Sequence, residues 1–221
     1  AEGGKAPATK ASGEQLHTIG PVALFQDSLP WGLSINEVIL NALGIPFDTL
    51  SSSQFGTVQL DQYEKVIIVS DQPQQFYDSL QVHRGRFEAY VNGGGILEIH
   101  ACDRGWNGGS WLVMPGGLTH VPEYMQLVDI ADPQHPIFND PYPISDDALD
   151  NWNYASHGYF TGYPALSTAL VVKYATDLPV FIESRYGSGV ILASMQPLEW
   201  GYNRGVPFLE NVMLYRPLVG R

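Results

Sequence analysis

Four side chains that can exchange protons stand at or shortly after the ends of apolar runs in this sequence. They are Asp27, Asp71, His100 and Glu199. If the runs are parallel strands, their carboxyl ends share one edge of a sheet, which is where α/β proteins bind ligands. A histidine beside carboxylates can perform acid–base chemistry or bind a divalent metal ion. The same residues can equally cap strand ends by bonding to loop backbone, so both interpretations stay open.

Aromatic residues form a second group that could bind a ligand. Trp106 and Trp111 enclose a run of Asn, Gly and Ser, and the later chain adds more rings. Tryptophan and tyrosine faces stack on apolar sugar faces and also dominate protein interfaces. We therefore predict a ligand platform, with carbohydrate as the candidate ligand, made of Trp106, Trp111, His157, Trp200 and Tyr202. Rings that could extend it are Trp152, Tyr154 and Tyr159. The alternative is that these rings cover a sheet edge within the chain.

Cys102 is the single cysteine of the chain. One cysteine excludes an internal disulfide and a cysteine-rich zinc site. A catalytic thiolate needs a general base and a lowered pKa, and neither is visible in the sequence, so we interpret Cys102 as a small buried thiol. The acidic residues between Asp140 and Asp150 match no EF-hand spacing and are interpreted as a solvated face. We expect no metal site and no cofactor.

The composition is strongly acidic, with 23 Asp and Glu against 11 Lys and Arg and a formal charge of -12. Such a surface repels phosphate backbones and anionic lipids, which disfavours nucleic-acid and membrane-surface binding. No apolar stretch reaches the roughly 18 residues of a membrane helix, so we expect no membrane insertion. The start Ala1-Glu2 resembles a signal-peptidase product, and the weakly charged, aromatic composition fits export. We expect an extracellular or periplasmic location, with a cytoplasmic one as the alternative.

The first half of the chain alternates strand and helix patterns. Lys65 to Ser70 is a continuous run rather than an alternating one, as in a parallel strand buried on both faces. The triple glycine after Asn92 ends a long helix that starts at Gln74. This rhythm predicts adjacent parallel strands with right-handed crossovers. The expected strands are 22–26, 47–50, 65–70 and 96–100, and the expected helices are 34–43 and 74–92.

The second half shows strand patterns separated by longer irregular passages. The turn Arg185 to Gly189 predicts an antiparallel hairpin. A helix with Pro207 in its first turn is expected to close the domain over 206–215. The strands expected here are 125–130, 169–174, 180–184 and 190–195. The predicted fold class is a doubly wound, flavodoxin-like α/β domain over 18–221, with a mostly parallel sheet and a C-terminal antiparallel hairpin.

Several segments together resemble the class I glutamine amidotransferase-like superfamily over residues 20–216. They are NGGGILEIHACDRGW, DPQHPIF, YGSGVILASMQPLEW and FLENVMLY. The closest likeness is to non-amidotransferase branches, which include ThuA-like proteins and the trimerisation domain of some β-galactosidases. Amidotransferases carry a cysteine nucleophile on a strained strand-to-helix turn, and the resemblance places His100 at that position. The His-x-Glu pair of a glutaminase is also missing, because Glu199 follows Pro197 and Leu198 without a histidine. Glutaminase activity is therefore not expected.

Two functions from different classes follow. The first is a non-catalytic binding or assembly module, a pseudoenzyme that has lost its nucleophile. The alternative is a hydrolase or isomerase that acts on a carbohydrate or small polar substrate through His100, Glu199 and Asp71. Burial of His100 by packed side chains would count against the alternative.

Residues 1–17 are rich in Ala, Gly, Lys and Pro and have almost no large apolar side chain. Such a segment cannot offset its own ordering entropy. We predict an extended N-terminal arm that lies along a neighbouring subunit and supports a homo-oligomer or filament.

Overall fold

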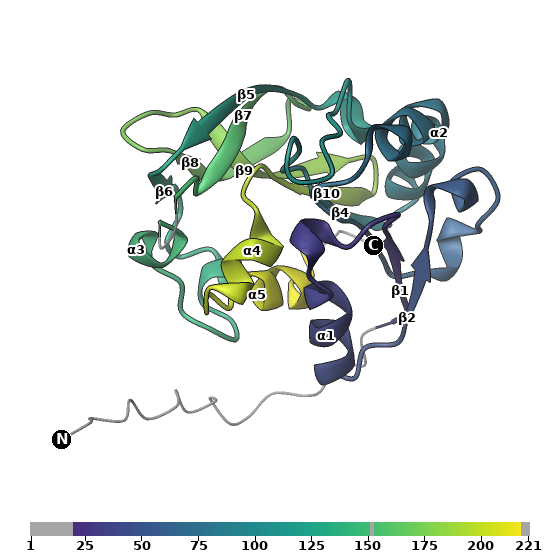
Figure 1. The fold of residues 1–221 in the computed structure, drawn as a ribbon, viewed down its shortest axis with the longest axis horizontal. Coiled ribbons are helices and arrows are strands. Elements are labelled where there is room, and N and C mark those ends of the chain that lie inside the picture. Colours follow the sequence, from purple (N-terminus) through teal and green to yellow (C-terminus); the bar gives the residue numbers. More distant parts are fainter. Residues whose placement is uncertain (1–19, 151–152, 218–221) are drawn as a thin grey trace.

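An eight-stranded sheet forms the centre of the structure, a computed structural model that describes residues 20–150 and 153–217 (Figure 1). Across the sheet the order is β2 (Phe47–Leu50), β1 (Val22–Phe25), β3 (Lys65–Ile68), β4 (Ile96–His100), β10 (Gly189–Ser194), β9 (Pro179–Tyr186), β8 (Ser167–Lys173) and β6 (Val128–Ile130). The predicted arm, residues 1–17, lies outside the described residues.

In the order β2, β1, β3, β4 and β10, each strand runs parallel to the next. Leu24 of β1 pairs with Ile67 of β3, and Ile67 pairs with Glu98 of β4. The other side of β4 pairs with β10. Every residue of β1, β3 and β4 is buried, because helices cover both faces of this part of the sheet. The predicted parallel order of the first half is confirmed, with His100 at the carboxyl end of β4.

The remaining strands of the sheet are antiparallel. The hairpin between β9 and β10 forms as predicted, and β8 and β6 continue the sheet beyond it. The single strand predicted over 125–130 is wrong. The chain instead forms β5 (Thr119–Met125) and β6, and β5 pairs with β7 (Ser156–Gly162) in a separate two-stranded sheet. Pro122 lacks a backbone donor, which suits β5 to so small a sheet.

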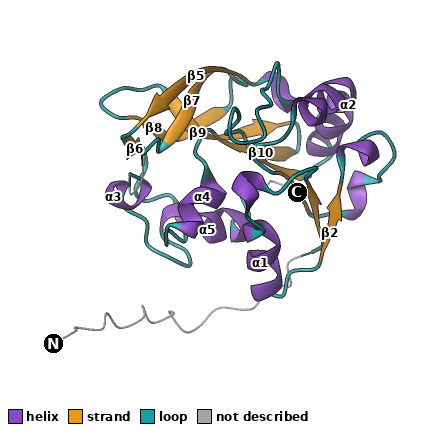
Figure 2. Ribbon diagram, viewed as in Figure 1, coloured by secondary structure: helices purple, strands orange, loops and turns teal. Residues whose placement is uncertain are grey.

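Helices cover the two faces of the large sheet. Figure 2 shows α2 (Gln74–Asn92) on one side and α1 (Ile35–Ala42), α4 (Leu198–Asn203) and α5 (Phe208–Leu214) on the other. The predicted bounds of α2 are confirmed. The expected inward positions of α2 are all buried: Phe76, Leu80, Phe87 and Val91. The fold is therefore a doubly wound, mostly parallel α/β fold.

The short helix α3 (Asp146–Leu149) lies in the acidic passage, where Asp140, Asp146 and Asp147 are exposed as a solvated face requires, and two of its carboxylates also bind backbone. The Asp150 carboxylate accepts a hydrogen bond from the backbone N–H of Val128 at 2.9 Å, and Asp146 accepts one from Ile130 at 2.6 Å. Both donors belong to β6, the edge strand of the large sheet. The two carboxylates therefore cap backbone donors that an edge strand would otherwise leave open.

Candidate ligand-binding cleft

His100 lies in a ladder of buried charges between the sheet and helices α4 and α5. Its Nδ1 is 2.6 Å from Glu199 Oε1, and its Nε2 is 2.8 Å from Glu98 Oε1. Glu98 also accepts a hydrogen bond from Lys65 Nζ at 2.7 Å. Side chains two apart on a strand share a face, so Glu98 and His100 both point toward these helices. The exposed fractions of Lys65, His100 and Glu199 are 0%.

The ladder carries two positive and two negative charges. Burial alone would lower the pKa of His100, but the carboxylates of Glu199 and Glu98 outweigh it and raise that pKa to about 9. Burial would raise the pKa of Glu98, and the cations of Lys65 and His100 instead hold it at about 2. Burial lowers the pKa of Lys65 to about 8 despite the attraction of Glu98. Near pH 7 the ladder is therefore neutral in sum.

His100 has no free lone pair, because both of its ring nitrogens contact carboxylate oxygens. An imidazolium whose two N–H groups both bind carboxylates can neither accept a proton nor coordinate a metal ion. The ladder also fastens Glu199, which accepts hydrogen bonds from the hydroxyl of Ser70 at 2.7 Å and from the Asn36 amide at 3.3 Å. The contacts around His100 and Glu199 are those of a structural group that joins β3 and β4 to the helices.

The residues after β4 do not form the sharp strand-to-helix turn that the resemblance implies at His100. His100 is the last residue of β4, and the left-handed backbone conformation occurs at Arg104, where φ is 58°. The chain then continues through loop rather than an α-helix toward β5. Burial, with the nearby charges of Asp103 and Glu199, raises the pKa of the Cys102 thiol well above its ordinary value. A thiolate at Cys102 is therefore disfavoured.

Asp71 holds two loops together at the carboxyl ends of the strands. Its carboxylate accepts hydrogen bonds from the backbone N–H of Trp31 at 3.1 Å and of Asn107 at 2.8 Å. Burial raises the pKa of Asp71, and these backbone donors partly offset the effect. Asp27 acts similarly, since its carboxylate accepts from the backbone N–H and hydroxyl of Ser52. Neither residue bonds to His100 or Glu199 within the described parts of the chain.

A cleft of about 500 Å³ opens beside these loops. Its aromatic lining consists of Trp31, Trp106, Tyr124, Tyr154, His157 and Trp200, and the remaining lining of Arg104, Gly105, Asn153, Pro197 and Arg204. Trp31 follows β1, the loop of Arg104 to Trp106 follows β4, and Trp200 follows β10. The cleft thus lies outside the carboxyl ends of the parallel strands, where α/β sheets bind ligands.

The rings of the cleft meet edge to face. The centroids of Trp106 and Trp200 are 5.7 Å apart at an interplanar angle of 68°, and those of Tyr124 and His157 are 4.8 Å apart at 75°. This arrangement leaves ring faces open to solvent, since the exposed fraction is 69% for Trp106 and 50% for Tyr154. Open aromatic faces in a concave site are typical of ligand pockets.

Backbone strain is concentrated around the same cleft. Five non-glycine residues of the described chain have positive φ, and three of them, Trp31, Arg104 and Tyr154, line the cleft. A fourth, Asp71, bonds to the backbone of Trp31. A left-handed conformation costs about 1–2 kcal/mol per residue. Strain of this kind persists where surrounding contacts impose it and is frequent at ligand clamps.

His157 presents an acceptor rather than a charge to the cleft. Burial lowers the pKa of His157, so the ring is neutral near pH 7. Its Nδ1 lies 3.1 Å from the backbone carbonyl of Asp103 and must donate to it, since a carbonyl oxygen only accepts. The remaining nitrogen, Nε2, is therefore unprotonated and can accept a hydrogen bond from a ligand hydroxyl.

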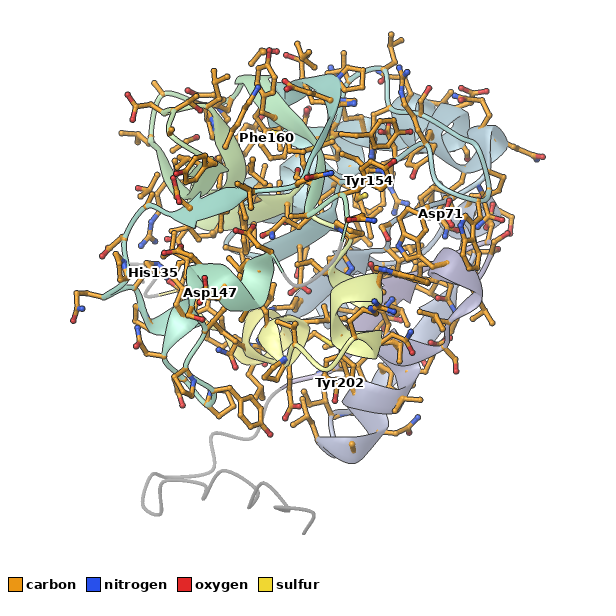
Figure 3. The ribbon with its side chains drawn as sticks, turned by 60° about the vertical axis from the view of Figure 1, so that its left-hand side comes forward. Asp71, His135, Asp147, Tyr154, Phe160 and Tyr202 are labelled. Carbon is orange, nitrogen blue, oxygen red and sulfur yellow. The ribbon has the colours of Figure 1, made fainter. Side chains whose placement is uncertain are left out.

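The predicted platform residues are divided between the cleft and other places. Trp106, His157 and Trp200 line the cleft. Trp111 is buried, packs against Tyr77 at 4.5 Å and donates its indole N–H to the carbonyl of Ala101. Tyr202 does not line the cleft. Figure 3 shows it at the lower edge of the molecule, away from Tyr154.

Seven lining residues are not among the predicted ligand residues: Trp31, Arg104, Gly105, Tyr124, Asn153, Pro197 and Arg204. A signal for Trp31 exists, because the stretch Pro30-Trp31-Gly32 follows the first strand directly. A ring between proline and glycine at that point lies where strand ends form a site. Arg104 and Arg204 carry no such signal, because they are 100 residues apart and only the fold places both at the cleft.

One sequence relative matches most of this chain. The chain is 34% identical over 199 residues to an uncharacterized protein of Clostridium acetobutylicum, a match that covers 88% of this chain. The chain spans about a fifth of the length of that relative, 20%. No family model matches the sequence. No helix among the described residues is both long enough and apolar enough to cross a membrane.

Three solved structures share the arrangement of elements. A glutamine amidotransferase from Thermotoga maritima superposes with a TM-score of 0.55 at 12% identity, covering 89% of this chain and 84% of that chain. An exo-β-1,4-mannosidase from Opitutaceae bacterium strain TAV5 also gives 0.55 at 12% identity, covering 92% of this chain and 37% of that one. A cytoplasmic protein from Salmonella typhimurium LT2 gives 0.54 at 12%, covering 87% and 98%. Likeness at this level of identity concerns the fold and not the activity. The chain therefore has a glutamine amidotransferase-like fold.

Proposed function

We propose that this chain is a non-catalytic binding module that holds carbohydrate in the cleft at the carboxyl ends of its parallel strands. The observation that carries the proposal is the contrast between two neighbouring groups of residues. The rings of Trp106, Tyr154 and Trp200 are open to a ligand, whereas the acid–base pair of His100 and Glu199 is sealed in the interior.

The composition of the cleft argues against the alternative, a hydrolase or isomerase acting through His100 and Glu199. Glycoside hydrolysis generally uses two carboxyl groups that flank the scissile bond. The described lining of the cleft contains no Asp or Glu. His157 is the one described lining residue with a titratable imidazole, and a single weak base is a poor substitute for that pair.

The proposal extends to the wider setting of the chain. A buried histidine at the end of β4 supports membership of the ThuA-like, non-amidotransferase branch. The relative from Clostridium acetobutylicum is about five times as long as the matched segment, since the match covers 20% of it. This ratio supports a role as one module of a longer protein. We propose further that this protein is exported, as the weakly charged, aromatic composition suggests, and that its copies assemble. Carbohydrate binding fits such a module, because it would hold a larger protein at a polysaccharide.

Binding measurements with ring-deletion variants test the proposal. Wild-type protein is screened on an array of neutral and charged oligosaccharides, and hits are titrated by calorimetry. We expect Trp106→Ala and Trp200→Ala each to weaken binding by about tenfold or more, because each removes a stacking face. Tyr163→Ala is the matched control, since Tyr163 is 45% exposed and lies outside the cleft.

Product analysis on the same ligands separates binding from catalysis. We expect intact oligosaccharide after prolonged incubation, and no ammonia release from glutamine above the blank. Turnover that disappears in His100→Gln would overturn the non-catalytic proposal in favour of the hydrolase or isomerase. Ammonia release that disappears in Cys102→Ala would instead identify Cys102 as a nucleophile.

A further inference from the structure

The charges at the mouth of the cleft have a sign opposite to that of the molecule. The chain carries a formal charge of -12, yet the described lining holds two arginines, Arg104 and Arg204, and no carboxylate. Arg104 comes from the loop after β4, and Arg204 caps the end of α4. Both side chains are exposed.

These two arginines differ from the other arginines of the described chain. Every other one is engaged: Arg84 with Glu88, Arg86 with the carbonyls of Phe55 and Val58, Arg185 with Glu183 and Arg216 with Glu64. Within residues 20–150 and 153–217, the guanidinium groups of Arg104 and Arg204 have neither an ion-pair partner nor a hydrogen-bond acceptor. In a protein with 23 acidic residues, two guanidinium groups at one cleft that have no partner among the described residues are available for an anionic ligand.

The two arginines line the same cleft as the rings. Arg104 is two residues from Trp106 and Arg204 is four residues from Trp200, and the centroids of these two indoles are 5.7 Å apart. The left-handed backbone of Arg104, with its N–H bonded to the carbonyl of Gly109 at 2.9 Å, sets the direction of its loop. A guanidinium fork matches the two oxygens of a carboxylate.

We propose that the ligand of the cleft is an acidic saccharide, in which a uronic carboxylate binds Arg104 and Arg204 while the sugar rings stack on the indoles. This inference rests on the proposed function, because it specifies the ligand of the same cleft. His157 Nε2 then accepts from a sugar hydroxyl, as its neutral tautomer allows.

The geometry favours a sugar over a nucleotide. A nucleobase is flat on both faces and binds best between parallel rings. The ring pairs of the cleft meet instead at interplanar angles of 80° for Trp31 and Trp106 and 60° for Tyr124 and Tyr154. Rings at such angles cannot sandwich a flat base, whereas each open ring face can stack on the apolar face of one pyranose.

Methyl esterification provides the sharpest test, since it removes the charge of a uronate and keeps its ring. Tetrasaccharides of galacturonate, mannuronate and hyaluronan are titrated by calorimetry, each beside its methyl ester. We expect at least one acid to bind, and its ester to bind about tenfold more weakly or worse, which corresponds to about 1.4 kcal/mol. The double variant Arg104→Gln/Arg204→Gln should reduce affinity for the acid to that for the ester and leave the ester unaffected. Arg185→Gln, whose arginine pairs with Glu183 outside the cleft, is the control.

Other outcomes separate this inference from the proposed function. Equal affinity for acid and ester, or an unchanged affinity of the double variant for the acid, overturns the anionic ligand. If neutral sugars still bind and Trp106→Ala abolishes that binding, the proposed function stands alone. Preferential binding of sulfated oligosaccharides or of a nucleotide such as UDP also overturns the uronate assignment. Binding of no saccharide, neutral or acidic, removes both proposals.

Discussion

Both ring nitrogens of His100 bond to carboxylates, Glu98 on its own strand and Glu199 on α4, so this residue stabilises the fold by its charge. The same contacts make its stability contribution depend on pH. The folded protein raises the pKa of His100 from 6.5 to about 9. A raised pKa means that the folded state binds the proton more tightly than the unfolded chain does. The stabilisation of the folded state by His100 is therefore complete below about pH 6.5 and is lost as pH rises toward 9.

We predict that the free energy of unfolding falls between pH 6.5 and pH 8, on the order of 2 kcal/mol, because of His100. Above pH 8 the opposing shift of Lys65, whose pKa is lowered to about 8, offsets the loss, because the buried ammonium then becomes neutral. Urea unfolding at several pH values measures the slope. In His100→Gln the fall should disappear, together with a loss of stability at pH 6.5, since Glu98 and Glu199 lose their shared partner. A wild-type slope that persists in the variant would assign the titration to another group.

At the scale of elements, structure that depends on a local pattern could be predicted from the sequence, and contacts between distant segments could not. The periodic apolar residues of α2, from Phe76 to Val91, predicted that helix and its buried face, because a helix expresses its pattern within a few turns. β5 pairs with β7, which brings Thr119 next to Gly162 although the two are far apart in the sequence. No local sequence pattern predicts this pairing. The cleft behaves in the same way. Trp106 could be predicted as a ligand residue from the Asn, Gly and Ser residues that follow it in the sequence. Arg204 lies at the same cleft only because α4 follows β10, the strand next to β4.

The loops that build the cleft touch closely at Gly109. An ideal Cβ on Gly109 would lie 2.3 Å from the carbonyl oxygen of Gln72 and 2.7 Å from the N of Gln74. We predict that Gly109→Ala pushes apart the loops after β3 and β4, destabilises the protein by about 1–3 kcal/mol and weakens binding in the cleft by displacing Trp106. Thermal unfolding and ligand titration measure the two effects.

Gly85→Ala is the matched control, because Gly85 lies inside α2 and its added Cβ would meet no atom within 4 Å. That substitution should stabilise the protein by about 0.5–1 kcal/mol through helix propensity and leave binding unchanged. If Gly109→Ala binds ligand as the wild type does, the crossing of these loops does not position the cleft.

At the scale of the whole molecule, the two edges of the large sheet differ in how far their backbone groups are covered. The edge strand β6 has backbone donors capped by Asp146 and Asp150. At the other edge β2 pairs, among the described residues, with β1 alone, and the middle of this strand, Asp48 and Thr49, is exposed. An edge strand of this kind can accept an extended segment from another chain. The residues 1–17 are mostly small or polar, a composition that suits such pairing.

We predict that deletion of residues 1–17 reduces assembly and leaves the fold intact. The buried core of the described chain begins at Val22, so thermal stability should stay within about 0.5 kcal/mol of the wild type. Assembly should fall because an arm that binds a neighbouring copy acts through repeated weak contacts, which are lost together. Sedimentation velocity over a range of concentrations compares the two proteins. Thr49→Pro, which places a residue without a backbone donor in the middle of β2, should mimic the deletion if that edge receives the arm. A truncated protein that sediments as the full-length one does would show that the arm takes no part in assembly.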